Sequence, residues 1–302
     1  MDIQSIASDI ARIHSPLQAG MPLAQLVADI PEHTDPVYRA AWLGASMLGF
    51  VPHDADCIAH AWQAQTQRTQ HFDIQDWPCD LQDFSTPELD TSLSFAACPH
   101  SLGLYAVLPD AEWVARMVAL EVPTVQLRFK SDDAAAVERE VKAAVKAVRN
   151  SKTLLFINDH WQHAIDAGAY GVHLGQEDMA QAPLEHIRLA GLRLGLSSHG
   201  YAEMLKAYAV QPSYLALGAV FPTTLKRMAT APQGVGRLAV YARLIRQQAL
   251  VAIGGIDIDT LPAVMSTGVG SVAFVRAIVG AHNPHEAVSQ LRQTMNRYKV
   301  NH

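Results

Sequence analysis

From Ser101 onward the chain alternates short apolar runs with amphipathic stretches, and this alternation constrains the fold more than any other feature. Eight runs have the length and composition of strands: Leu104–Leu108, Thr124–Phe129, Thr153–Ile157, Gly171–Gly175, Arg193–Ser197, Tyr214–Phe221, Leu250–Ile256 and Ser271–Val275. Helical periodicity marks the stretches Ala111–Leu120, Ala134–Arg149, Pro183–Ala190, Ala202–Ala209, Arg237–Gln247 and Pro284–Tyr298. Eight β/α repeats predict an α/β protein built as a (β/α)8 TIM barrel. An open doubly wound sheet is the alternative, but the early glycine fingerprint of that fold is missing.

The residues before the repeats divide into two further parts. Residues 1–70 have helical periodicity in Ile3–Ile13, Pro22–Ile30, Pro36–Phe50 and Ala55–Gln67. Residues 71–101 contain several prolines and many acids, and no Lys or Arg occurs between Arg68 and Arg116, so we expect a solvated linker or, alternatively, a flap over the later domain. The predicted domains are therefore a helical extension at 1–70, a linker or flap at 71–101 and the barrel at 102–302.

Composition limits the partners of the protein. A net charge of −6 and a pI near 6.1 give no basic footprint for nucleic acid or for an anionic membrane, so a small molecule is the expected partner. The acidic start of the chain lacks a leader pattern, and no later stretch has the length of a membrane span, which predicts a cytoplasmic protein. Three cysteines in the first third favour reduced thiols over a disulfide framework. His53, Cys57 and His60 have helical spacing, but without a fourth ligand they are more typical of an ordinary helix face than of a metal site.

Two acids follow neighbouring predicted strands. Asp159 comes directly after the run that ends at Ile157, and Asp178 follows Gly171–Gly175. The carboxyl ends of parallel strands meet on one rim of a barrel, so both carboxylates should face a shared crevice. Mg²⁺ usually takes only one or two protein carboxylates, together with waters and substrate phosphates. The spacing therefore predicts a Mg²⁺–diphosphate site.

Other polar residues lie at the same predicted rim. Strand alternation places Gln126, Arg128 and Lys130 on one side, towards the barrel interior and its mouth. The other candidates are Asn158, His173, Ser197, His199, the loop residues Thr223, Thr224 and Lys226, and Gly254–Gly255, whose backbone can approach an anion. We interpret His173 as an interior histidine rather than an acid or base. His199 either assists at a diphosphate or orients Ser197 or the strand end.

Seven motifs in order resemble those of the thiamine phosphate synthase (thiamine-phosphate pyrophosphorylase) family. They are QLRFK at Gln126–Lys130, IND at Ile157–Asp159, GVHLGQED at Gly171–Asp178, SSH at Ser197–His199, FPTTLK at Phe221–Lys226, APQG at Ala231–Gly234 and VAIGGI at Val251–Ile256. The resemblance covers about residues 102–302 and leaves the N-terminal extension unrecognised. Each motif alone is weak, since Gly-Gly or Asn-Asp pairs also serve as turns, but their number and order are specific.

The resemblance implies a transferase of thiamine biosynthesis. In this family 4-amino-2-methyl-5-hydroxymethylpyrimidine diphosphate loses pyrophosphate, and a thiazole phosphate nitrogen captures the pyrimidine methylene to give thiamine phosphate. It implies metal ligation (Mg²⁺) by Asp159 and Asp178, and catalytic roles for Arg128, Lys130, Ser197 and Lys226. The implied pyrimidine diphosphate contacts are Gln126, Leu127, Arg128, Phe129, Lys130, Asn158, Ser197 and Lys226, and the implied thiazole phosphate contacts are Thr223, Thr224, Leu225, Gly255, Val275 and Arg276.

Three positions depart from the family pattern. Phe129 stands where an acid is common, and alternation points it outward. Leu225 replaces a second threonine, at an expected cost of about 1 kcal/mol in phosphate binding, and Arg276 replaces a usual serine. Two other functions stay open: a tautomerase of a related barrel family, which lacks the two metal acids, or a catalytically weakened barrel that serves as a ligand-binding or assembly module. For the N-terminal residues we consider a remnant of a fused kinase, an oligomerisation element in a homodimer, or a lid.

Overall fold

A computed structural model, which describes residues 2–19, 31–223 and 230–299, contains a closed barrel of eight parallel strands in chain order. The strands are β1 (Gly103–Leu108), β2 (Thr124–Leu127), β3 (Leu154–Asn158), β4 (Gly171–Leu174), β5 (Arg193–Ser198), β6 (Tyr214–Leu217), β7 (Leu250–Ala252) and β8 (Ser271–Phe274). Closure is made by β8 against β1, with Gly103 opposite Ser271. The predicted (β/α)8 barrel is confirmed.

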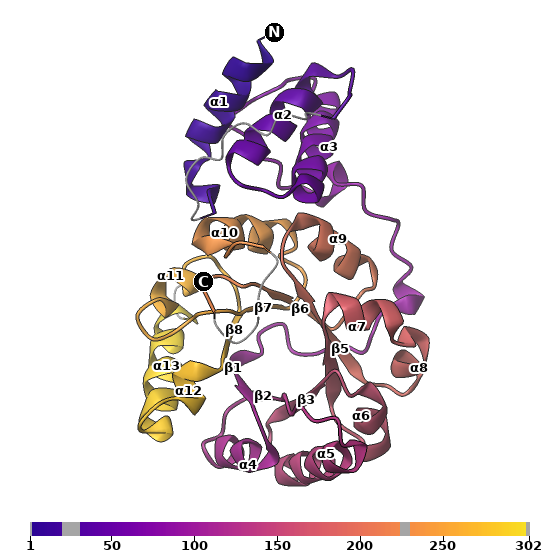
Figure 1. Ribbon diagram of the computed structural model, residues 1–302, viewed down its shortest axis with the longest axis vertical. Coiled ribbons are helices and arrows are strands. Elements are labelled where there is room, and N and C mark those ends of the chain that lie inside the picture. The colour runs from indigo at the N-terminus through magenta and orange to yellow at the C-terminus, as the bar shows by residue number, and fades with distance from the viewer. Residues whose placement is uncertain (1, 20–30, 224–229, 300–302) are drawn as a thin grey trace.

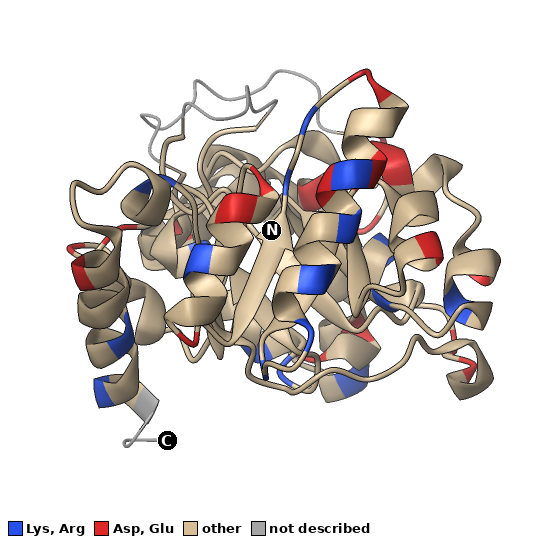
Figure 2. Cartoon of the chain, turned by 90° about the horizontal axis from the view of Figure 1, so that it is seen from below, with Lys and Arg blue, Asp and Glu red and all other residues tan. Residues whose placement is uncertain are grey.

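Helices surround the barrel and bury its outer face. They are α4 (Ala111–Ala119), α5 (Ala134–Val148), α6 (Trp161–Ala167), α7 (Gln176–Gln181), α8 (Leu184–Leu189), α9 (Tyr201–Ala209), α10 (Gly234–Leu244), α11 (Leu261–Met265), α12 (Arg276–Val279) and α13 (Pro284–Lys299). Alternate strand residues point inward, where Tyr105, Phe156 and Tyr214 fill the barrel with small aliphatic side chains, or outward, where Leu155 and Val172 pack in the larger core. Acidic and basic residues lie mainly on the helices and loops around largely uncharged strands (Figure 2).

Several predicted strands are longer than the observed ones. Strand β2 ends at Leu127 rather than Phe129, β6 ends at Leu217 rather than Phe221, and β7 ends at Ala252 rather than Ile256. The last difference has a clear cause, because Gly254 and Gly255 have φ angles of 105° and 65°, which no strand residue adopts. Helices α7, α11 and α12, which have six, five and four residues, were not predicted.

Within residues 2–19 and 31–102, three α-helices precede the barrel: α1 (Ile3–Ile13), α2 (Pro36–Met47) and α3 (Pro52–Thr69). Helix α2 begins as its sequence suggests, because the Asp35 carboxylate accepts hydrogen bonds from the Val37 and Tyr38 backbone N–H groups and Pro36 occupies the first turn. The expected helix Pro22–Ile30 lies outside the described residues. Figure 1 shows the three helices together at one side of the barrel, next to α9 and α10.

The N-terminal helices approach the barrel closely enough to require glycine at two positions. A Cβ atom on Gly236 of α10 would lie 1.9 Å from the Pro16 carbonyl oxygen, and one on Gly200 would lie 2.1 Å from Asp54 Oδ2. Asp54 is buried and its Oδ1 accepts a hydrogen bond of 2.9 Å from the Ala202 backbone N–H in the first turn of α9. The extension and the barrel therefore share one packed and hydrogen-bonded interface.

Residues 71–101, which we call the strap, connect α3 to β1 and pack against the barrel. Trp77, Phe84 and Phe95 are buried, and the Trp77 indole N–H donates to the Tyr201 hydroxyl at 2.9 Å. The strap then runs past the amino ends of the strands, where the Ser213 hydroxyl donates to the Ala96 carbonyl oxygen at 2.6 Å. The strap is thus anchored to the barrel by its buried aromatic residues while most of its other residues stay exposed, and none of its described residues lines the cavity at the barrel mouth.

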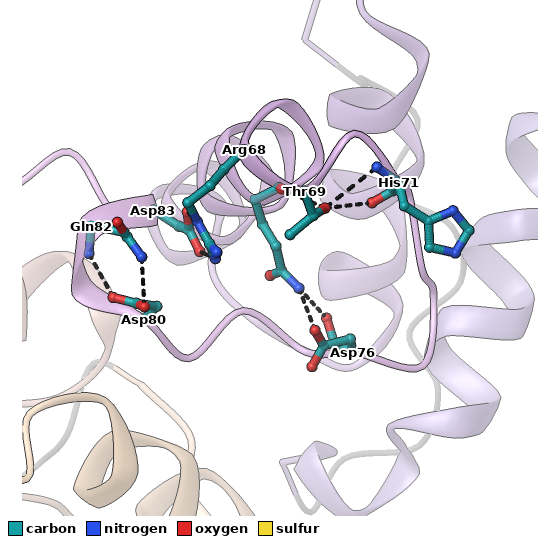
Figure 3. A network of polar contacts seen from close by, with 8 residues as sticks. Arg68, Thr69, His71, Asp76, Asp80, Gln82 and Asp83 are labelled. Carbon is teal, nitrogen blue, oxygen red and sulfur yellow. Dashed lines mark hydrogen bonds and ion pairs between the residues drawn. The ribbon is translucent and has the colours of Figure 1, made fainter.

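A polar network holds the start of the strap to the end of α3. The Arg68 guanidinium donates through Nε and Nη2 to the two carboxylate oxygens of Asp83, which is buried (Figure 3). Gln65 donates to the Asp76 carboxylate at 2.7 Å in the same network. The network explains how Asp83 can be buried, since Arg68 neutralises its carboxylate, while the other acids of the strap stay exposed or half-buried.

Two expectations from composition can be compared with the described residues. All three cysteines have free thiols. Among the helices of residues 2–19, 31–223 and 230–299, none combines the length and the apolar character needed to cross a bilayer.

Candidate active site

A cavity of about 640 Å³ opens at the carboxyl ends of the strands. Most of the predicted site residues line it: Gln126, Arg128, Lys130, Asn158, Asp159, Asp178, Ser197, Thr223, Gly255, Val275 and Arg276. Leu127 and Phe129 are not in its lining and instead pack in the outer core, as alternation along β2 requires. Thr224, Leu225 and Lys226 lie outside the described residues.

Asp159 and Asp178 face the same cavity, as the β3–α6–β4 connection requires. Burial and the negative charge of Asp178 raise the pKa of Asp159, against the opposing effects of Lys130, His160 and Arg128. Lys130 Nζ lies 3.7 Å from Asp159 Oδ2. Two carboxylates that face one cavity concentrate negative charge there and make a place where a cation is stabilised.

Asp159 also has an unusual backbone. Its φ angle is 62°, in the left-handed region that costs about 1–2 kcal/mol for a residue other than glycine. The chain turns sharply here, because the Asp159 backbone N–H donates to the His173 carbonyl oxygen while the Trp161 N–H donates to the Asp159 carbonyl oxygen. Non-glycine residues in this conformation are concentrated at functional sites, and here the turn places the carboxylate at the cavity.

Ser197, at the carboxyl end of β5, is held by two neighbours. His173 Nε2 lies 2.8 Å from its Oγ, and the Gln176 side-chain N–H donates to its carbonyl oxygen at 2.7 Å. Burial lowers the pKa of His173 to about 4, with a further contribution from the charge of Arg128. His173 is therefore neutral at pH 7, in agreement with its interpretation as an interior histidine.

The loops after β6, β7 and β8 complete the mouth. A Cβ on Gly255 would lie 2.6 Å from the Pro222 carbonyl oxygen, so glycine there allows the β7 loop to touch the β6 loop. The Phe221 backbone N–H donates to the Gly254 carbonyl oxygen at 2.9 Å, which joins the same two loops. The sequence analysis explained Gly255 only by the approach of its backbone to an anion. The close contact between the two loops is a second reason for glycine at this position.

Sequence patterns gave no role to two tyrosines beneath the cavity. The Tyr105 and Tyr214 hydroxyls lie 2.7 Å apart, and the Tyr214 hydroxyl lies 2.7 Å from His173 Nδ1. Their only signal in the sequence is a polar aromatic side chain at an inward position of an apolar strand. His199, by contrast, pairs with Glu203 of α9 at 2.6 Å, which holds the loop after β5 rather than Ser197.

The arrangement defines a class of protein: a (β/α)8 barrel whose mouth offers paired carboxylates, cationic side chains and a serine to a phosphorylated substrate. The family model described as thiamine monophosphate synthase matches residues 104–278. The chain belongs to this family.

Individual relatives agree with the family match. The thiamine-phosphate synthase of Neisseria meningitidis serogroup A is 52% identical over 196 residues, which span 65% of this chain and 96% of the relative. The thiamine-phosphate synthase of Cronobacter sakazakii is 49% identical over 197 residues, covering 65% of this chain and 94% of the relative. Among solved structures, thiamine phosphate pyrophosphorylase from Pyrococcus furiosus has a TM-score of 0.58 and 29% identity, covering 65% of this chain and 96% of that one.

Proposed function

We propose that this protein is a thiamine-phosphate synthase, a transferase that joins the pyrimidine of a diphosphate ester to thiazole phosphate and releases pyrophosphate. The observation that carries the proposal is the placement of Asp159 and Asp178 beside Arg128 and Lys130 in one cavity. A departing diphosphate accumulates negative charge as its C–O bond breaks, so it needs fixed cations and hydrogen-bond donors around it. Two relatives named thiamine-phosphate synthase, with 52% and 49% sequence identity to this chain, support the same function.

The residues divide between the two substrates. Arg128, Lys130 and Ser197 would hold the diphosphate, with Asn158 beside it and Gln126 facing the pyrimidine, and Lys226 is proposed as a further cation. The thiazole phosphate would lie at the opposite loops, on Thr223, Thr224, Leu225, Gly255, Val275 and Arg276. Since the thiazole nitrogen is itself the nucleophile, the reaction requires no nucleophilic side chain.

We propose Mg²⁺ as the metal at Asp159 and Asp178. The donor set fits this ion, because within the described ranges no third His, Cys, Asp or Glu joins them, and Mg²⁺ commonly uses one or two carboxylates with water and phosphate oxygens. The raised pKa of Asp159 supports the assignment, since a bound cation would relieve its repulsion from Asp178. Bound Mg²⁺ would supply charge stabilisation to the leaving diphosphate.

The test is formation of thiamine phosphate with and without Mg²⁺ by the full chain and by Asp159→Asn. Asparagine tolerates a positive φ angle, so this variant should fold while losing the charge that holds the metal. We expect its rate to fall at least about 100-fold, close to 3 kcal/mol of transition-state stabilisation. Asp166→Asn, an exposed carboxylate on α6, is the matched control and should keep the rate of the unmodified protein.

An inactive but folded protein would favour the ligand-binding or assembly module instead. A metal-independent isomerisation of a thiazole substrate would favour the tautomerase, a function that the presence of both Asp159 and Asp178 argues against.

We further propose the division into a helical extension at 1–70, a strap at 71–101 and a catalytic barrel at 102–302. The cytoplasmic location and the homodimer stay predictions, which cell fractionation and analytical ultracentrifugation would test.

A further inference from the structure

Five hydrogen-bonded side chains form a continuous chain beneath the cavity. Gln126 Nε2 donates to the Tyr105 hydroxyl at 3.0 Å, and the Tyr105 and Tyr214 hydroxyls are 2.7 Å apart. The Tyr214 hydroxyl then lies 2.7 Å from His173 Nδ1, and His173 Nε2 lies 2.8 Å from Ser197 Oγ. We call this chain the relay; its members come from β2, β1, β6, β4 and β5. It therefore crosses the barrel interior and ends at a residue of the cavity.

The barrel is built around the relay. Tyr105 and Tyr214 are 1% and 0% exposed, so a hydroxyl without a partner there would cost about 1–3 kcal/mol. The Phe156 ring packs against both, with ring centroids 6.1 Å from Tyr105 and 5.0 Å from Tyr214. A Cβ atom on Gly195 would lie 2.1 Å from the Tyr214 ring, so β5 leaves the space that this ring fills. In such apolar surroundings the hydroxyls must bond to each other and to His173.

The chemistry of its two ends sets the direction of the relay. The amide nitrogen of Gln126 can only donate, so the Tyr105 oxygen accepts, and the Tyr105 proton is directed to Tyr214. Tyr214 in turn donates its single proton to His173 Nδ1. His173 is 8% exposed and each of its ring nitrogens faces a hydroxyl rather than a carboxylate, so the imidazole is neutral. Its single proton must then lie on Nε2 and point at Ser197 Oγ. The hydroxyl proton of Ser197 is thereby left to face the cavity.

We propose that Gln126, Tyr105, Tyr214 and His173 are positioning residues that turn the Ser197 hydroxyl into a fixed hydrogen-bond donor to the departing diphosphate. The inference rests on the proposed function for the identity of the acceptor. In the opposite direction Ser197 would donate to His173 and present its lone pairs to an anion, which would repel it. The relay transfers no proton; it fixes one orientation before the reaction, so that no reorganisation is needed when charge develops.

The direct test is the tautomer of His173, measured from its ring nitrogen-15 shifts and couplings. The protein has 14 histidines, so the signals are assigned by their loss in His173→Gln. We expect the Nε2–H tautomer in the unmodified protein and a population of the Nδ1–H tautomer in Tyr214→Phe, which lacks the proton donated to Nδ1. An Nδ1–H tautomer in the unmodified protein would overturn the proposal.

Kinetics give a second test in the same variants. Tyr214→Phe should lower kcat about 10- to 100-fold while the KM of the pyrimidine diphosphate changes little, because the donor matters most when charge develops on the leaving group. The double variant Tyr214→Phe with Ser197→Ala should be no slower than Ser197→Ala alone. Additive losses, or an unchanged kcat in Tyr214→Phe, would contradict the role of the relay.

Tyr170→Phe is the matched control. Tyr170 packs edge-on against Phe156 with ring centroids 5.5 Å apart, but its hydroxyl lies outside the relay, beside Arg193. Tyr170→Phe should leave both the His173 tautomer and kcat unchanged. If it lowered kcat as much as Tyr214→Phe does, the loss of kcat in Tyr214→Phe would be explained by packing and not by the relay. The tautomer measurement needs no substrate, so it tests the relay even if the protein forms no thiamine phosphate, which would overturn the proposed function alone.

Discussion

Arg237 on helix α10 joins the barrel to the N-terminal helices, and replacing it with methionine should destabilise the whole protein. The side chain is 2% exposed. Its Nε donates to the Leu17 carbonyl oxygen at 2.8 Å and its Nη2 donates to the Leu48 carbonyl oxygen at 2.9 Å. The guanidinium carbon lies 3.6 Å from the centre of the Phe50 ring. One barrel side chain thus contacts two separate segments of the extension.

The magnitude follows from the groups that the substitution leaves behind. Two buried carbonyl oxygens lose charge-assisted donors, at about 1–3 kcal/mol each, and the cation–π contact with Phe50 contributes about 2 kcal/mol when desolvated. Part of this loss is offset, because methionine removes the cost of burying a charge and fills much of the volume. We therefore expect Arg237→Met to lower the free energy of unfolding by about 3–5 kcal/mol.

Urea unfolding followed by tryptophan fluorescence measures this effect. Trp42, Trp62 and Trp77 report on the extension and strap, and Trp113 and Trp161 report on the barrel. Arg243→Met, an exposed arginine on the same helix, is the matched control and should change the free energy of unfolding by less than about 0.5 kcal/mol. A loss of less than about 1 kcal/mol in Arg237→Met would refute the view that Arg237 fixes the extension to the barrel.

Three further predictions use other parts of the structure. Because the folded pKa of His173 is about 4 and the unfolded value is about 6.5, its contribution is fully present above pH 6.5 and is lost as pH falls to 4. Between pH 6.5 and pH 4 the free energy of unfolding, measured with urea, should therefore fall by about 3 kcal/mol more in the unmodified protein than in His173→Gln. Gly236→Ala should lower the melting temperature, since its Cβ would overlap the Pro16 carbonyl oxygen, and an unchanged value would contradict that close approach. Asp178→Asn should lower the pKa of Asp159, measured by carbon-13 NMR without metal, because it removes a neighbouring negative charge.

The barrel and the position of its mouth could be predicted from the sequence because both depend on local patterns. Strand and helix periods are written in consecutive residues, and parallel strands end on the same rim in every (β/α)8 barrel. Asp159 and Asp178 could therefore be placed together from their position after two strands, and the cavity contains both. Phe129 could be directed outward by the same alternation, and it packs in the outer core.

Contacts between distant parts of the chain could not be predicted in this way. The acidic composition of the strap predicted a solvated linker or a flap and gave no contact for Trp77, which donates to Tyr201, 124 residues further on. Arg237 binds the carbonyl oxygen of Leu17, 220 residues earlier. A single sequence records no such pairings, because they depend on which surfaces meet after each part has folded.

The sequence by itself determined the eight repeats and the rim at which the polar residues gather, since both follow from short-range pattern and spacing, and its ordered motifs carry the resemblance to the family. Only the tertiary structure decided that Tyr105, Tyr214 and His173 form one hydrogen-bonded chain to Ser197, and that Asp54, Trp77 and the Leu17 carbonyl group of the N-terminal part contact the barrel. The hydrogen-bonded chain and the packing of the N-terminal part have the same physical reason. Burial determines which polar groups must find partners, and the closed barrel determines which partners lie within reach.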